Sequence, residues 1–212
     1  MIILYIHGMG GGADSRIPSI LRERIPAASG VETVVRTYDF DPEKGAAQIA
    51  AWVEELRPSL IIGESLGALQ ALRVHGIPHL FVSPSLNATL YLDAFAYLSL
   101  LPGVTPLLDR IYRPKPGDRQ PLHFTFRTLR KYRAHRRAAL SGTSRAGSPD
   151  RFYAFFGERD HYRRSGVVSV RTWRRHFGSD TFRMYPGTHF MEAEFVESLL
   201  IPKIHEMLDL HI

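Results

Sequence analysis

Three polar residues of the chain, Ser65, Asp160 and His189, are of the types that together turn a hydroxyl group into a nucleophile. A serine hydroxyl attacks poorly until an adjacent base takes its proton. A histidine can be that base, and a carboxylate can hold the imidazole in the required tautomer and stabilise the imidazolium that forms. We therefore predict attack on a carbonyl group, with Ser65 as nucleophile, His189 as base and Asp160 as the orienting acid.

The surroundings of Ser65 favour this role. Residues 63–67 read Gly-Glu-Ser-Leu-Gly, a Gly-x-Ser-x-Gly pattern, with an apolar run before it and apolar residues at helical spacing after it. A strand that turns sharply into a helix holds a serine at the apex of the turn, and the two glycines let the backbone pack where a Cβ would clash. The alternative is that Ser65 is an ordinary helix N-cap.

An attacked carbonyl becomes an oxyanion, which needs hydrogen-bond donors already in place. We expect the backbone N–H groups of Leu66 and of Met9, in the glycine-rich stretch after the first apolar run, to supply them. Gly8, Gly10 and Glu64 are expected to contact the substrate. Whether Glu64 faces the pocket or only water is left open.

Each of these residues has a plainer interpretation. His189 can be a loop histidine without a role, and Asp160 can cap the following helix while Glu158, in the same loop, serves as the acid. We expect His161 to lie at the surface or face the substrate, and His7 to order the glycine-rich loop rather than act as a base. Residues 10–12 match no phosphate-binding fingerprint.

Apolar and β-branched runs alternate with amphipathic stretches along most of the chain. They predict strands at residues 1–6, 32–38, 59–62, 79–82, 152–156 and 181–185. They also predict helices at residues 44–57, 66–74, 125–140, 166–177 and 191–210. Pro202 is expected to kink the last helix or to split it after Leu200.

This alternation predicts an α/β protein, a three-layer α/β/α sandwich with a mostly parallel sheet of about six strands. Right-handed crossovers bring the carboxyl ends of such strands to one edge of the sheet. The candidate residues all follow strands, so we expect them to meet at that edge. Residues 84–150 interrupt the alternation and are predicted to form a helical lid or cap insertion within one domain, residues 1–212.

Composition narrows the classes further. A chain of 212 residues with 44% hydrophobic and 23% charged residues fits one globular domain. The absence of cysteine excludes disulfides, thiolate metal sites and a cysteine nucleophile. The histidines lack metal-ligand spacing, so we expect neither a metal nor another cofactor.

The termini and the charge distribution bear on location and partners. The first residues lack a basic leader and are interpreted as a strand rather than a signal peptide, and no apolar run approaches the ~20 residues that cross a bilayer. We therefore expect a cytoplasmic protein without stable membrane association. The net charge is +6, with basic residues grouped in 127–137 and 159–175. These groups are solvated helix faces or sites for an acidic ligand, and no motif suggests nucleic acid.

The chain resembles the α/β-hydrolase superfamily in the order Ser65, Asp160, His189 around the Gly-x-Ser-x-Gly turn. The His7-Gly8 pair resembles the oxyanion loop of that family, and residues 157–160 resemble its acid loop. The resemblance covers residues 1–83 and 151–212. The compact size and the early first strand look like the small YqiA-like esterases, although two strands that usually lead the fold are missing.

The resemblance implies a serine hydrolase, of the carboxylesterase or thioesterase kind, that cleaves a small-molecule ester or thioester through an acyl-enzyme intermediate. The apolar stretch 86–101 either lines an acyl pocket or packs on the core. An amidase or peptidase using the same residues, and a non-catalytic binding protein on the same fold, are the alternatives. The sequence indicates neither the acyl chain nor the oligomeric state.

Overall fold

The six strands form one sheet in the order β2-β1-β3-β4-β5-β6, and every neighbouring pair is parallel. The computed structural model describes residues 1–25, 30–114, 116–141 and 151–210. The strands are β1 (Ile2–Ile6), β2 (Glu32–Val35), β3 (Leu60–Glu64), β4 (His79–Val82), β5 (Phe152–Gly157) and β6 (Phe182–Tyr185). The predicted parallel sheet is confirmed.

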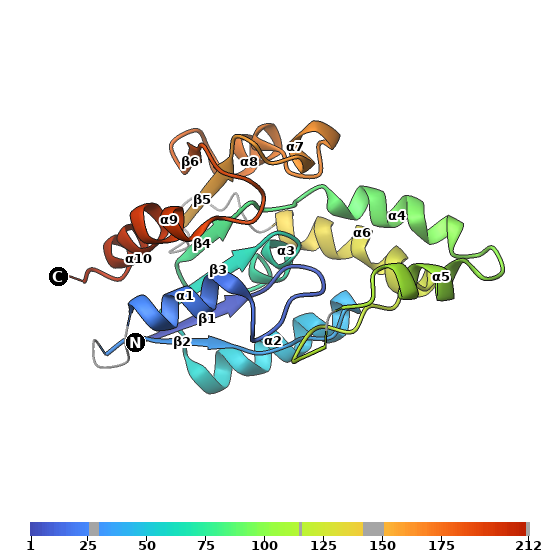
Figure 1. Cartoon of the computed structure of the whole chain (residues 1–212), viewed down its shortest axis with the longest axis horizontal. Helices are drawn as coiled ribbons and strands as arrows, with labels where there is room; N and C mark the ends of the chain where they lie inside the picture. Colours follow the sequence, from blue (N-terminus) through green and yellow to red (C-terminus); the bar gives the residue numbers. More distant parts are fainter. Residues whose placement is uncertain (26–29, 115, 142–150, 211–212) are drawn as a thin grey trace.

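Helices cover both faces of this sheet, because apolar side chains alternate along each strand (Figure 1). Ile3 and Leu60 pack on one face with α1 (Arg16–Arg24) and the carboxyl-terminal helix, whereas Leu4 and Ile61 pack on the other. The second face is covered by α2 (Pro42–Leu56), α3 (Gly67–Ala71), α6 (Phe126–Ser141) and α8 (Val170–Phe177). The result is the predicted three-layer α/β/α arrangement.

Element boundaries differ from the expected ones where local hydrogen bonds intervene. The helix predicted over 166–177 begins only at Val170, as α8, because the Ser169 hydroxyl caps it by accepting from the Thr172 N–H. A short helix that was not predicted, α7 (Tyr162–Ser165), precedes it. The last helix consists of α9 (Ala193–Phe195), a π-helical turn η2 (Val196–Leu200) and α10 (Ile201–Met207). Pro202 lies in the first turn of α10, so the change of helix type falls after Leu200 as expected.

Three helices lie between β4 and β5, in the stretch predicted as an insertion. They are α4 (Ala88–Leu98), α5 (Val104–Ile111) and α6. Figure 1 shows α4 and α5 beyond the end toward which the strands point. The third helix, α6, packs against α4 and also against α2 and α3, and its Tyr132 hydroxyl donates to the Phe40 carbonyl oxygen at 2.7 Å. Part of the predicted insertion, residues 115 and 142–150, lies outside the described residues.

The basic side chains of α6 mostly hold helices together. Arg130 contacts Asp93 at 2.5 Å, and Lys131 contacts Asp41 at 2.6 Å. Arg136 donates to the Leu86 carbonyl oxygen at 2.7 Å. Part of this basic group therefore makes internal contacts with α2 and the α4 region, which neither alternative anticipated, while Arg127 and Arg137 are exposed to solvent. Within the described residues, none of the helices is both long and apolar enough to cross a bilayer.

Candidate active site

Ser65 lies in a sharp turn between β3 and α3 and has a left-handed backbone with φ 50°. The turn is fixed because the Ser65 N–H donates to the Val82 carbonyl oxygen at 3.0 Å. At Gly67 an added Cβ would lie 2.3 Å from the His7 carbonyl oxygen, so only glycine allows α3 to begin so close to β1. Ser65 is not a helix cap, because α3 begins after Leu66 and no side chain caps it.

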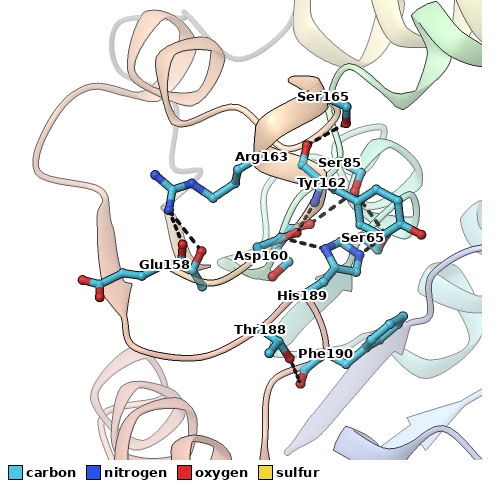
Figure 2. A network of polar contacts seen from close by, with 12 residues as sticks. Ser65, Ser85, Glu158, Asp160, Tyr162, Arg163, Ser165, Thr188, His189 and Phe190 are labelled. Atoms are coloured by element: carbon cyan, nitrogen blue, oxygen red, sulfur yellow. Dashed lines mark hydrogen bonds and ion pairs between the residues drawn. The ribbon is translucent and has the colours of Figure 1, made fainter.

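The structure brings the three predicted residues together from three loops. Figure 2 shows the His189 ring between Asp160 and Ser65. The Nε2 atom of His189 lies 2.9 Å from the Ser65 hydroxyl oxygen, and Nδ1 lies 2.8 Å from Asp160 Oδ2. Since a carboxylate only accepts, Nδ1 carries the proton and Nε2 is left to accept from the serine. Both Asp160 and His189 are buried.

Asp160 also stabilises the loop that carries it. Its Oδ1 atom accepts from the Tyr162 N–H at 2.8 Å, whereas Oδ2 contacts His189. Asp160 is not the cap of α7, because His161 occupies that position. The rival acid Glu158 is exposed and points away from His189 in Figure 2. His161 is also exposed, with its ring centroid 6.2 Å from that of His189.

Sequence reasoning missed a second serine beside Ser65. The hydroxyl oxygens of Ser65 and Ser85 are 3.1 Å apart, and the Ser85 N–H donates to the Ser65 carbonyl oxygen at 3.0 Å. Ser85 follows β4, so the rule that selected the other loops, that functional residues follow parallel strands, would also have selected this one.

The glycine-rich loop after β1 lies against Ser65. A Cβ placed on Gly8 would lie 3.0 Å from the Ser65 Cβ. The Gly8 carbonyl oxygen is held by His7 Nδ1 at 2.8 Å and by the Gly11 N–H at 3.0 Å. In a trans peptide the next N–H points the opposite way, so the Met9 N–H is directed away from these partners. Among the described residues, no backbone acceptor contacts the N–H of Met9 or Leu66.

His7 supports the loop, in agreement with its predicted ordering role. Its ring is buried and stacks on Tyr38 at a centroid distance of 4.6 Å, and the Tyr38 hydroxyl donates to the His7 carbonyl oxygen at 2.8 Å. Burial lowers the pKa of the His7 imidazole. Since a carbonyl oxygen only accepts, His7 Nδ1 carries a proton and donates it in the hydrogen bond to the Gly8 carbonyl oxygen.

Backbone N–H groups in this loop are engaged by the protein itself. Gly10 donates to Gln120 Oε1 at 3.1 Å, Gly11 donates to the Gly8 carbonyl oxygen, and Gly12 donates to the Ser15 hydroxyl oxygen at 3.2 Å. These contacts leave the three glycine N–H groups occupied, which argues against a phosphate cradle. In the parts of the chain that are described, no group of three histidine or acidic residues is arranged to hold a metal ion.

Glu64 faces the cavity rather than only the solvent. It is partly buried, and its Oε2 atom accepts from the Tyr5 hydroxyl at 2.7 Å. Burial raises the pKa of the Glu64 carboxyl, against a smaller lowering by the hydrogen bond from the Tyr5 hydroxyl. Of the two positions left open by the sequence, the pocket or only water, Glu64 therefore occupies the first.

A cavity of about 830 Å³ adjoins Ser65. All five residues predicted as oxyanion donors or substrate contacts line it: Gly8, Met9, Gly10, Glu64 and Leu66. The opposite wall is apolar and comes from α4 and α5, through Tyr91, Leu92, Phe95 and Leu108. Residues of the stretch 86–101 lie both at this cavity and in the core: Leu86 and Ala96 are buried in the core, and Leu92 belongs to both.

Comparisons with known proteins identify the architecture. The structure is similar to a monoacylglycerol lipase from Paleococcus ferrophilus, with TM-score 0.63 and 14% identity over 98% of this chain and 94% of that one. A putative hydrolase from Agrobacterium vitis S4 gives TM-score 0.65 and 15% identity over 98% and 87%. An extracellular α/β-hydrolase from a Paenibacillus species gives TM-score 0.58 and 13% identity over 95% and 98%.

The chain therefore has the α/β-hydrolase fold, as the resemblance of its motifs implies. No protein-family model matches the sequence, and no curated protein matches it. At such low identity the likeness establishes the fold alone, so the chemistry has to be argued from the site.

Proposed function

We propose that this protein is a serine hydrolase that cleaves a carboxylic ester or thioester through an acyl-enzyme intermediate. The observation that carries the proposal is the continuous chain of contacts from Asp160 through His189 to the Ser65 hydroxyl, at 2.8 and 2.9 Å. Support also comes from solved structures of this fold that are described as a monoacylglycerol lipase and as a thermophilic esterase from Thermogutta terrifontis.

The reaction follows from the positions of the protons. Ser65 Oγ forms a bond to the carbonyl carbon while its proton passes to His189 Nε2, and the carbonyl oxygen becomes an oxyanion. The carbon–oxygen or carbon–sulfur bond to the leaving group then breaks, and His189 gives its proton to that group. Water, deprotonated by His189, attacks the acyl-enzyme and releases the acid and Ser65. Asp160 stays ionised and stabilises the imidazolium in both halves.

Two backbone N–H groups are proposed to hold the oxyanion. Those of Met9 and Leu66 line the cavity beside Ser65, and no backbone acceptor contacts them within the described residues. Donors fixed in advance need no reorganisation during the reaction, which is why such a site lowers the barrier by about 3 kcal/mol per donor.

The acyl chain is proposed to lie along the apolar wall formed by α4 and α5. We define the described residues 86–114 and 116–124 as the cap, which includes both helices and the segment that precedes α6. The proposed cap is only part of the predicted insertion 84–150. The rest of the described insertion is mainly α6, which supports α4 and also packs against α2 and α3. Tyr91 and Phe95 offer aromatic surface suited to an aliphatic chain.

Intact mass after treatment with a fluorophosphonate tests the proposal. Wild type is expected to gain one adduct, and Ser65→Ala is expected to gain none, because only an activated serine reacts. Ser85→Ala is the matched control, since it removes the neighbouring hydroxyl and should still take up one equivalent. Ser65→Ala should also lose hydrolysis of short acyl esters. An adduct on Ser65→Ala, or ester hydrolysis that survives this change, would contradict the assignment.

A further inference from the structure

Part of the cap contacts the loop that carries the proposed oxyanion donor. Gln120 is buried, and its side-chain amide bridges two segments: Oε1 accepts from the Gly10 N–H at 3.1 Å, and Nε2 donates to the Tyr38 carbonyl oxygen at 3.1 Å. The Gln120 backbone N–H donates to the Gly11 carbonyl oxygen at 2.8 Å. One residue of the cap therefore makes three hydrogen bonds, two to the glycine-rich loop and one to Tyr38.

Neighbouring residues hold Gln120 in place. Arg119 pairs with Gly12 in an isolated antiparallel bridge, and its guanidinium contacts Asp14 at 3.1 Å. The Ala13 N–H donates to the Asp118 carbonyl oxygen at 3.2 Å. A Cβ on Gly12 would lie 1.7 Å from that same oxygen, so the two segments touch backbone to backbone. The backbone on the N-terminal side of Gln120 is thus fixed against residues 12–14.

The hydrogen bonds of Gln120 fix one of the two peptide units that flank Met9. The peptide unit before Met9 is held through the Gly8 carbonyl oxygen by His7 and Gly11. The peptide unit after Met9 is held through the Gly10 N–H by Gln120. Glycine rotates freely about its backbone bonds, and Gly10 has φ 70°, so the second unit would be free to turn without this acceptor.

We propose that Gln120 is a positioning residue for the oxyanion hole, which fixes the Met9 N–H from the cap. The inference rests on the proposed function and extends it, because it makes the oxyanion hole depend on a cap residue that does not touch the substrate. The Phe124 N–H donates to Asp109 of α5 at 2.9 Å, and Phe124 lines the cavity. The same segment therefore connects the apolar wall to the oxyanion loop.

The test compares Gln120→Leu with Gln70→Leu. Gln70 is another buried glutamine, whose Nε2 donates to the Pro42 carbonyl oxygen outside the site, so it controls for the loss of a buried amide. Gln120→Leu is expected to lower kcat about tenfold or more with KM within twofold, because a misplaced donor acts on the transition state. Gln70→Leu should leave kcat unchanged.

Affinity for an alkylboronic acid gives a second measure. The boronate adduct on a serine is tetrahedral and places an oxygen where the oxyanion forms, so its affinity should fall by the same factor as kcat in Gln120→Leu. A residue needed only for folding would lower the melting temperature and leave kcat and boronate affinity unchanged. That result would overturn the proposal.

Gln120→Glu keeps the test decisive if the leucine variant fails to fold. A protonated glutamic acid can accept from Gly10 and donate to the Tyr38 carbonyl oxygen, whereas its carboxylate faces that oxygen without a proton. The ratio of its kcat to that of wild type should therefore fall as the pH rises, and a ratio that is constant with pH would contradict the inference. If wild type neither takes up fluorophosphonate nor hydrolyses esters, the proposed function fails, and this inference with it.

Discussion

Ser65 combines a half-buried hydroxyl at the cavity with a backbone conformation that few residues other than glycine adopt. Its φ of 50° costs on the order of 1–3 kcal/mol, and this cost is offset because the neighbouring strands and Ser85 hold the turn by hydrogen bonds. The strain places the hydroxyl at the cavity wall, within reach of His189. At the scale of the residue, reactivity depends on this placement.

Asp160→Asn and Glu158→Gln distinguish the two acids of the loop after β5. Asparagine keeps the shape of Asp160 but favours the wrong imidazole tautomer of His189, so we expect kcat to fall by about 10³- to 10⁴-fold. Glu158 is exposed and points away, so Glu158→Gln should leave kcat within twofold. Steady-state kinetics of ester hydrolysis measures both. A larger loss in the glutamine variant would reassign the acid.

At the scale of the element, α4 presents different faces to different surroundings. Tyr91, Leu92 and Phe95 line the cavity, Ala96 is buried in the core, and Leu90 is 56% exposed. Tyr91 and Phe95 are four residues apart and lie on the cavity side, whereas Leu92 and Ala96 are four residues apart and lie in the core cluster, with Leu92 also reaching the cavity. A single apolar helix therefore packs on the core and forms the cavity wall at the same time. Its exposed side can therefore be altered without changing the pocket.

Phe95→Ala is expected to shift chain-length preference toward longer acyl groups. Removing the ring enlarges the cavity, and each further methylene group buried there contributes about 0.8 kcal/mol. The ratio of kcat/KM for long to short esters should therefore rise about tenfold if two more methylenes enter. Leu90→Ala, on the exposed side of the same helix, is the control and should leave the ratio unchanged. Equal ratios in both variants would place the acyl chain elsewhere.

At the scale of the whole molecule, buried histidines make stability depend on pH. His135 of α6 is buried, and its Nε2 has no hydrogen-bond partner among the described residues. Burial, with the positive charge of Arg73, lowers the pKa of His135 from 6.5 to about 4. The unfolded chain therefore binds a proton that the folded protein excludes, and the folded state loses stability as the pH falls from about 6.5 toward about 4.

His135→Leu should remove this part of the acid sensitivity. Between pH 8 and pH 5 the free energy of unfolding of wild type should fall by about 2 kcal/mol more than that of the variant. Burial also lowers the pKa of His7 and His176, but both remain in the variant and cancel in the difference. Urea denaturation at the two pH values measures it, and a difference that does not change with pH would show that His135 does not contribute.

The sequence by itself determined the α/β class, the parallel sheet and the residues that meet at its edge. Strand patterns and Gly-x-Ser-x-Gly are local, and the carboxyl ends of parallel strands must share one edge. Ser65, Asp160 and His189 could therefore be chosen before their distances were known. Helix ends were less certain, because a single cap at Ser169 decides where α8 begins.

Only the tertiary structure decided which groups act on those residues from elsewhere in the chain. Gln120 follows no predicted strand and carries no motif, and its importance arises from a contact at 3.1 Å with Gly10. Ser85 follows a predicted strand, but only the structure shows that its hydroxyl oxygen lies 3.1 Å from that of Ser65. The two faces of the 86–101 stretch likewise depend on which side of α4 meets the core. Local sequence patterns encode strands and turns, whereas contacts between distant segments follow from how those elements pack.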